Sequence, residues 1–215
     1  MDDADFYTNK RQKMVSEQLI PRQITDPRVL EAMGMTARHL FVPEEHRHQA
    51  YADGPLPIGN NQTISQPYTV AFMTEALRVA KGQKVLEVGT GSGYQAAILA
   101  ALGARVYTIE RHIHLLSEAR KRFDKLGYQI ASKAGDGTIG WKEYAPYDGI
   151  IVTAGAPDVP QPLLDQLSEG GILVIPIGGP ETQNLCIITR HHGAFETREV
   201  AGFKFVPLIG TKGWK

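Results

Sequence analysis

The sequence lacks the features that would mark an extracellular, membrane or nucleic-acid-binding protein. Cys186 is the only cysteine, so no internal disulfide can form, which fits a reducing cytoplasm. Lys and Arg number 23 and Asp and Glu also number 23, so the charge gives no sign of nucleic-acid or anionic-membrane binding. No apolar run is long enough to cross a bilayer, and the acidic start (Asp2, Asp3, Asp5) is unlike a secretory signal. We therefore expect a cytoplasmic protein, although neutral charge does not by itself exclude a nucleic-acid substrate.

The length and hydrophobic content indicate a single α/β domain. The chain has 215 residues, of which 42% are hydrophobic, enough for a sizeable core. We expect strands at residues 84–88, 105–110, 128–134, 147–153, 172–175, 184–190 and 197–200. The last two strands have no helix between them and should pair antiparallel, whereas the buried apolar strand at 147–153 is typical of a parallel sheet.

Helical patterns occupy the N-terminal part and the spaces between strands. Apolar residues recur at helical spacing from Asn9 to Ile20, Asp26-Pro27 is a helix start, and helices are expected from Pro67 to Val79 and at 113–126. A short helix carrying Leu163, Leu164 and Leu167 should close at Gly170-Gly171, and residues 39–43 should be extended. Residues 1–10 are expected to be a frayed terminus.

The stretch from Lys84 to Gln95 predicts a cofactor site. An apolar run containing Glu87 is followed by Gly89, Gly91 and Gly93 and then by a helical run, which indicates a strand, a tight turn and a helix. The spacing G-x-G-x-G differs from the dinucleotide fingerprint G-x-G-x-x-G, and the Glu87 carboxylate would repel a pyrophosphate. It suits a cofactor with a cationic amino group and no phosphate, such as S-adenosylmethionine (AdoMet). A glycine-rich turn without a ligand is the simpler alternative.

Two acidic residues after later strands could also face this cofactor. Glu110 lies roughly 20 residues beyond the glycines, where an acid at a strand end can bind ribose hydroxyls. Asp136, in the turn Gly135-Asp136-Gly137, could reach the adenine edge, although such a turn often has no ligand. In a doubly wound α/β fold, Gly89, Glu110, Asp136 and Thr153 should converge at the carboxyl ends of the parallel strands.

Ser65 precedes a helix that Pro67 opens, and it has two interpretations. It could cap the helix, or its hydroxyl could hold an anion together with the exposed N–H groups and the helix dipole. The sequence alone does not separate these. The pair His46 and His48 is more typical of a solvated surface than of a metal site, and we expect no metal.

Several segments together resemble the protein-L-isoaspartate O-methyltransferase family, over nearly the whole chain from about Met14. The segments are Leu56–Gly59, Gln62–Pro67, Leu86–Gln95, Gly135–Gly137, Tyr147-Asp148 with Ile150–Thr153, and Phe205–Leu208. The glycine motif is shared by AdoMet-dependent methyltransferases in general, whereas Gln62–Pro67 singles out this family. Asn60-Asn61 and Thr153–Pro157 depart from the usual pattern, outside the motif core.

The resemblance implies a repair enzyme that moves the AdoMet methyl group to the free α-carboxylate of L-isoaspartyl residues in damaged proteins, releasing S-adenosyl-L-homocysteine. The fold implied is a Rossmann-like class I methyltransferase sheet of roughly seven strands, with an N-terminal helical and substrate-side segment at residues 11–80 and the AdoMet-binding sheet at 81–215. The active-site serine falls on Ser65, and substrate contacts fall on Thr63, Ile64 and Ser65. Cofactor contacts fall on Glu87, Gly89, Thr90, Gly91, Ser92, Gly93, Glu110, Arg111, Asp136 and Gly137. We expect a monomer, because an enzyme that admits many peptides needs an accessible cleft.

Three other functions share part of this pattern. A methyltransferase acting on a small molecule or RNA would keep the glycine turn and Glu110 but would not need Gln62–Pro67. A nicotinamide dehydrogenase is disfavoured by Glu87 and the glycine spacing. A non-catalytic AdoMet-binding module would not need the segment around Ser65.

Overall fold

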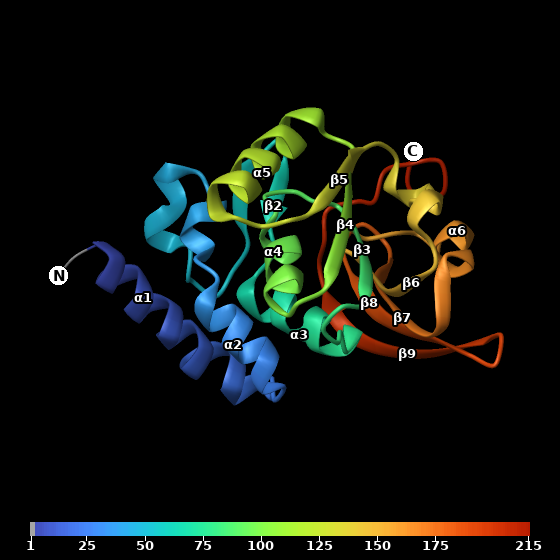
Figure 1. Ribbon diagram of the computed structural model, residues 1–215, viewed down its shortest axis with the longest axis horizontal. Coiled ribbons are helices and arrows are strands. Elements are labelled where there is room, and N and C mark those ends of the chain that lie inside the picture. Colours follow the sequence, from blue (N-terminus) through green and yellow to red (C-terminus); the bar gives the residue numbers. More distant parts are fainter. Residues whose placement is uncertain (1–2) are drawn as a thin grey trace.

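Seven strands form the central sheet, in the order β5-β4-β3-β6-β7-β8-β9. The computed structural model describes residues 3–215 (Figure 1). The strands are β3 (Lys84–Val88), β4 (Arg105–Glu110), β5 (Ala131–Ala134), β6 (Tyr147–Val152), β7 (Leu167–Gly178), β8 (Gln183–His191) and β9 (Ala194–Phe203). Strands β5, β4, β3, β6 and β7 are parallel, while β8 and β9 are antiparallel. The expected seven-strand sheet and its antiparallel end are confirmed.

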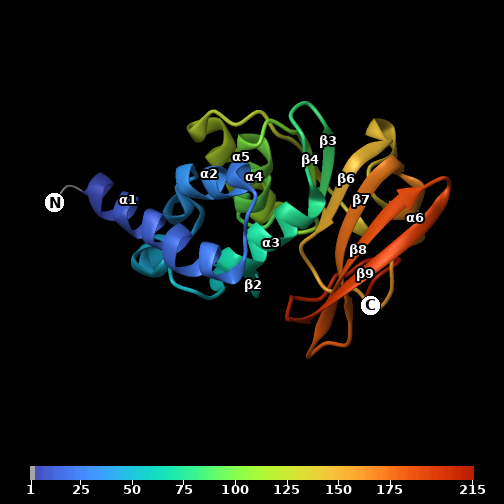
Figure 2. The same ribbon diagram turned by 90° about the horizontal axis from the view of Figure 1, so that it is seen from below.

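Helices cover both faces of the sheet, so the fold is doubly wound as expected. The helices α3 (Pro67–Leu77), α4 (Tyr94–Ala101) and α5 (Ile113–Leu126) pack on one face through a shared buried cluster. The opposite face packs against α6 (Gln161–Asp165) and the C-terminal segment. Figure 2 shows the sheet between these layers. In the part of the chain that the structure describes, no helix has the length and apolarity to span a bilayer.

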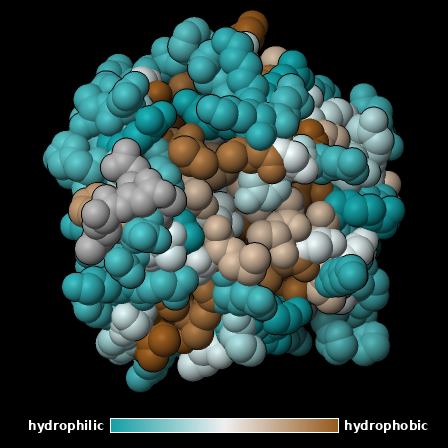
Figure 3. Space-filling model, turned by 60° about the vertical axis from the view of Figure 1, so that its left-hand side comes forward, coloured by the Kyte–Doolittle hydropathy of each residue, from teal (hydrophilic) through white to brown (hydrophobic). Residues whose placement is uncertain are grey.

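A third layer is formed by the N-terminal helices, which pack on α3 and α4 rather than on the sheet. They are α1 (Asp3–Lys13), the π-helix η1 (Met14–Leu19), the 3-10 helix η2 (Ile20–Arg22), α2 (Pro27–Met35), and the 3-10 helices η3 (Arg38–Phe41) and η4 (Glu44–Gln49). On the face seen in Figure 3, apolar residues gather near the middle and hydrophilic residues surround them.

Some N-terminal expectations are wrong. From Asp3 onward the chain is helical rather than frayed, because Arg11 Nε donates to the carbonyl of Gly34 over 2.7 Å and the Tyr7 ring stacks on His39 at 3.9 Å. The expectation for Met1 and Asp2 lies outside the described residues. The segment 39–43 is mostly a 3-10 helix and not extended. The expected helix start at Asp26 is confirmed, since its side chain accepts the N–H of Arg28.

The short helix before β7 also ends earlier than the glycines predicted. Helix α6 stops at Asp165, and Leu167, Gly170 and Gly171 belong to β7. Pairing explains the difference, because Leu167 is in register with Tyr147 of β6 and Tyr147 donates its N–H to the Gln166 carbonyl. Sheet pairing thus takes precedence over the local glycine signal.

A small hairpin carries the segment around Ser65 to the main fold. Strands β1 (Leu56–Gly59) and β2 (Gln62–Ile64) are antiparallel. Asn60 and Asn61 form the turn in the left-handed region, with φ of 51° and 55°, which asparagine tolerates better than most residues. This turn accounts physically for the Asn60-Asn61 pair.

Candidate active site

A cavity opens where β3, β4 and β6 end. Its floor includes Val88 at the end of β3, Glu110 at the end of β4, and Thr153 just after β6. The connections from β3 lead to β4 on one side, and β6 lies on the other, so the cavity sits at the switch point of the sheet. Open α/β sheets bind ligands at this position.

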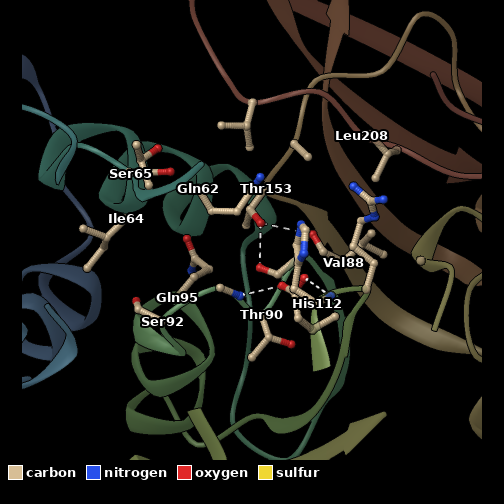
Figure 4. Close-up of a pocket in the computed structure, with 18 of the residues that line it drawn as sticks. Gln62, Ile64, Ser65, Val88, Thr90, Ser92, Gln95, His112, Thr153 and Leu208 are labelled. Carbon is tan, nitrogen blue, oxygen red and sulfur yellow. Dashed lines mark hydrogen bonds between the residues drawn. The ribbon is translucent and has the colours of Figure 1, made fainter. Parts of the chain in front are cut away.

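Two further segments complete the walls. One is Gln62–Ser65, which comprises strand β2 of the hairpin and the residue after it, and the other is Val206–Ile209, which follows β9. In Figure 4, Ile64 and Ser65 lie to one side and Leu208 to the other, with Thr90, His112 and Thr153 between them. The cavity is lined by these members of the expected set: Thr63, Ile64, Ser65, Gly89, Thr90, Gly91, Ser92, Glu110, Arg111 and Gly137. Glu87, Gly93 and Asp136 are not among the lining residues.

The first two turn glycines meet the cavity, and the third meets a helix. Gly89 has φ of 98°, and a Cβ there would lie 2.4 Å from Thr153 Oγ1, whose hydroxyl donates to the Gly89 carbonyl over 2.8 Å. Gly91 has φ of 52° and also lines the cavity. At Gly93 a Cβ would lie 2.5 Å from the Phe123 ring of α5. Gly93 therefore permits close packing of α5 and is not among the cavity-lining residues.

Glu110 holds two loops at the cavity. Its Oε2 accepts the N–H of Gly91 and its Oε1 accepts the N–H of His112, each over 2.9 Å. The residue is only 5% exposed. A carboxylate has about four lone-pair sites, so each oxygen can accept one more hydrogen bond from a ligand.

Glu87 lies beneath the glycine turn. Successive strand residues point to opposite faces, so Val88 reaches the cavity while Glu87 points toward the helix layer, where it is fully buried. Its Oε2 accepts the Thr108 hydroxyl, which lies 2.6 Å from the hydroxyl of Thr90. Burial raises the pKa of Glu87 to about 8, with the nearby Glu110 carboxylate also raising it. The expected direct contact between a Glu87 carboxylate and a cationic group is not what this geometry shows.

Asp136 binds the C-terminal segment instead of facing the cavity. Its Oδ1 accepts the N–H of Thr138 over 2.9 Å, and its Oδ2 accepts the N–H of Thr211 over 2.8 Å. Both hydroxyls also donate to it. The neighbouring Gly137 does line the cavity, and a Cβ there would lie 2.3 Å from Val88 Cγ1. Asp136 thus fixes the segment that supplies the wall at Val206–Ile209.

The capping interpretation of Ser65 is contradicted by the start of α3. The N-cap position is Gln66, and it makes no side-chain cap hydrogen bond. Ser65 is half-buried and lines the cavity, and its carbonyl accepts a hydrogen bond from Arg38 Nη2 over 2.7 Å. The Ser65 hydroxyl is therefore available to a ligand rather than to the helix.

A sequence model described as Protein-L-isoaspartate(D-aspartate) O-methyltransferase (PCMT) matches residues 9–213. The chain belongs to this O-methyltransferase family. A PCMT relative from Geobacter metallireducens, a protein-L-isoaspartate O-methyltransferase, is 55% identical over 206 residues, covering 95% of each chain. One from Desulfosudis oleivorans with the same name is 52% identical and covers 97% of this chain and 95% of its own.

Solved structures of PCMT proteins share the fold. A protein-L-isoaspartate O-methyltransferase has a TM-score of 0.84 at 25% identity, over 96% of this chain and 67% of its own. A putative PCMT from Plasmodium falciparum, solved in complex with S-adenosyl-L-homocysteine, has a TM-score of 0.81 at 26% identity and covers 93% and 98%. The family and the class I methyltransferase fold expected from the sequence are confirmed, and the dehydrogenase alternative is wrong.

The sequence assigned no site role to several cavity residues. Gln95 is on α4 and donates from Nε2 to the Thr74 hydroxyl over 2.9 Å. His112, just before α5, also lines the cavity, and its Nε2 is buried without a partner among the described residues. The wall Val206–Ile209 overlaps the family segment Phe205–Leu208, to which the sequence assigned no position at the cavity.

Replacing Glu87 with glutamine should flatten the pH dependence of stability. The folded carboxyl keeps its proton to about pH 8, whereas the carboxyl of an unfolded chain loses it near the ordinary glutamate value of 4.5. The folded state therefore binds the extra proton, and its free energy of unfolding falls as pH rises between those values. Glu87→Gln has no such proton to lose.

The measurement is urea unfolding of wild type and Glu87→Gln at several pH values from 5 to about 9. The variant should gain stability relative to wild type as pH rises. Glu118→Gln, at a partly exposed site on α5 where Lys121 lowers the carboxyl pKa, should not show that gain. Parallel curves for Glu87→Gln and wild type would contradict the buried, protonated state of Glu87.

Proposed function

We propose that the protein repairs damaged proteins by methylating the free α-carboxylate of L-isoaspartyl residues with AdoMet. The observation that carries this is the placement of the family-specific segment Gln62–Ser65 on one wall of the cavity, opposite the glycine turn and Glu110. The resulting methyl ester closes to a succinimide without the enzyme. Hydrolysis of the succinimide then partly restores normal aspartate.

The cavity residues fit the nucleoside part of AdoMet. Glu110 presents a carboxylate whose remaining lone pairs suit ribose hydroxyls. Gly89 and Gly91 let the backbone approach closely. When bound, AdoMet supplies an electrophilic methyl group on a sulfonium.

The acceptor needs no general base. A carboxylate is already ionised at neutral pH, because its pKa is about 4. The protein's task is to bring this anion into line with the methyl group and to exclude water, which otherwise stabilises both charges. Apolar side chains at Ile64, Val206 and Leu208 line the cavity and suit this task.

Ser65 is proposed to orient the acceptor carboxylate by donating its hydroxyl. A stronger donor, such as a cation in direct contact, would hold the oxygen lone pair and slow its attack. Thr63 and Ile64, which line the same wall, are proposed to contact the polypeptide around the isoaspartyl residue. The serine thus acts as a positioning donor and not as a nucleophile.

The protein is further proposed to act as a cytoplasmic monomer on polypeptides and not on nucleic acid. Balanced charge, a single buried cysteine and a cavity walled by one chain support this. A cavity completed by one chain needs no second copy to bind substrate.

Ser65→Ala should lower kcat by roughly one to three orders of magnitude, comparable to removing one positioned donor. The AdoMet dissociation constant should change little, because Ser65 lies on the acceptor wall. Steady-state kinetics with an isoaspartyl peptide and calorimetry with AdoMet measure the two quantities. Ser16→Ala, an exposed serine on η1, is the matched control and should behave as wild type. Wild-type kinetics in Ser65→Ala would remove the proposed role.

Glu110→Ala should weaken AdoMet binding about 10- to 100-fold, because hydrogen bonds to a charged group are worth roughly 1.5–3 kcal/mol. Loss of the bonds to Gly91 and His112 also loosens the glycine turn. Calorimetry gives the affinity, and circular dichroism checks that the fold persists. The control is Glu118→Ala, an acid on α5 outside the cavity lining. An unchanged affinity in Glu110→Ala would contradict its contact with the cofactor.

The function itself is tested with labelled AdoMet and two peptides that differ only in one isoaspartate or aspartate. Transfer should occur to the isoaspartyl peptide and not to its partner, and the label should be lost in mild base as a methyl ester is. Labelling of neither peptide while AdoMet binds would refute the substrate and favour a non-catalytic or different methyltransferase role.

A further inference from the structure

Arg38 is a buried arginine directly behind the acceptor wall. It lies on η3 and its side chain is 0% exposed. Its Nε donates to the carbonyl of Ala50 and its Nη2 donates to the carbonyl of Ser65, both over 2.7 Å. The guanidinium fork therefore joins the chain before the hairpin to Ser65 itself.

The same guanidinium also contacts the cofactor side of the cavity. It lies 4.9 Å from the ring centre of Tyr94, the first residue of α4 and part of the cavity lining. Tyr94 follows the glycine turn directly, so its position is tied to that of the turn. Arg38 thus touches both the residue that carries the acceptor donor and the helix that starts at the cofactor turn.

The charge of Arg38 has no acidic partner. None of the ion pairs among residues 3–215 includes it, and its Nη1 is buried without a hydrogen-bond partner there. Burial lowers the pKa of Arg38 only to about 10, so the group stays protonated at neutral pH. An unpaired buried charge is costly to fold around, so a purely structural role would be served better by an apolar residue of similar size.

We propose that Arg38 is a positioning residue for methyl transfer: it fixes the backbone of Ser65 relative to Tyr94 and keeps a positive charge behind the acceptor wall. This inference rests on the proposed function. Arg38 is not itself among the cavity-lining residues, so it acts through Ser65 and Tyr94 and through its charge.

The two parts of this role address separate needs of the reaction. The acceptor wall belongs to the N-terminal half and the cofactor turn to the sheet, and small errors in their spacing reduce the rate of an in-line transfer strongly. The buried charge attracts an anionic carboxylate through a medium of low dielectric constant. Because it does not touch the acceptor, it leaves the attacking lone pair free.

The test compares Arg38→Met, Arg38→Lys and Ser65→Ala, and the Arg38→Met/Ser65→Ala double variant, with saturating AdoMet. Arg38→Met should lower kcat about 10- to 100-fold and raise the peptide KM about 10-fold, because spacing and charge are both lost. Arg38→Lys should recover most of KM but little of kcat, since an ammonium keeps the charge without the fork. In the Ser65→Ala background, Arg38→Met should change kcat less than about threefold.

Controls separate this role from a general loss of stability. The AdoMet dissociation constant should stay within about threefold of wild type in each Arg38 variant, because Arg38 does not bind the cofactor directly. Arg105, the first residue of β4, donates to the Gly82 carbonyl and lies outside the cavity lining. Arg105→Met should therefore leave kcat and KM unchanged. If Arg38→Met does not fold, Arg38→Lys tests the proposal instead, because the proposal requires a lowered kcat together with a KM close to that of wild type.

If the reductions in kcat caused by Arg38→Met and Ser65→Ala multiply in the double variant, the assignment of Arg38 is overturned. An unchanged kcat in a folded Arg38→Lys would also overturn it. A wild-type enzyme that labels isoaspartyl peptide shows that such a failure concerns Arg38 alone. A wild-type enzyme that labels no isoaspartyl peptide would overturn the proposed function and the role of Arg38 together.

Discussion

The Glu110 carboxylate accepts one backbone N–H from the loop after β3 and another from the loop after β4. This pair of bonds fixes the edge of the sheet at which every other part of the site is placed. The first bond holds the glycine turn at Gly91, and the second holds His112, the residue directly before α5. A carboxylate in this place also affects which ligand groups can bind beside it, because it attracts hydroxyl donors and cationic groups and repels anions.

Opposite charges lie on opposite sides of the cavity. Glu110 faces the cavity from the sheet, while Arg38 is buried behind the Ser65 wall. A reaction that joins a carboxylate to a sulfonium methyl removes one negative and one positive charge, so a site with this arrangement can favour the approach of both reactants. Neither group needs to gain or lose a proton. Glu87, which does hold a proton, is separated from the cavity by the Thr108 and Thr90 hydroxyls.

The sequence predicted most of the sheet and those cavity residues that belong to short motifs. Helix α5 was predicted at both ends, and Gly89, Gly91, Glu110 and Ser65 all line the cavity. Glu87, Gly93 and Asp136 are next to cavity residues in the sequence but do not line the cavity themselves. The side chains of Glu87 and Asp136, and the Cβ position of Gly93, point toward other parts of the fold. The direction of a side chain depends on packing, which a local motif does not encode. Gln95 and Arg38 make their contacts with residues distant in sequence, which no local pattern encodes.

One wall of the cavity comes from Val206–Ile209, which follows the last strand of the sheet and is held by the bonds between Asp136 and Thr211. The order of synthesis therefore matters. A nascent chain that has not yet passed Val206 can already pair its parallel strands, yet its cofactor floor is open to water on that side. Removal of the residues after Phe203 would have the same effect, giving a chain that keeps its sheet and lacks this wall of the cavity. Integrity of the fold and integrity of the site are thus separable, and a folded sample is not by itself a competent one.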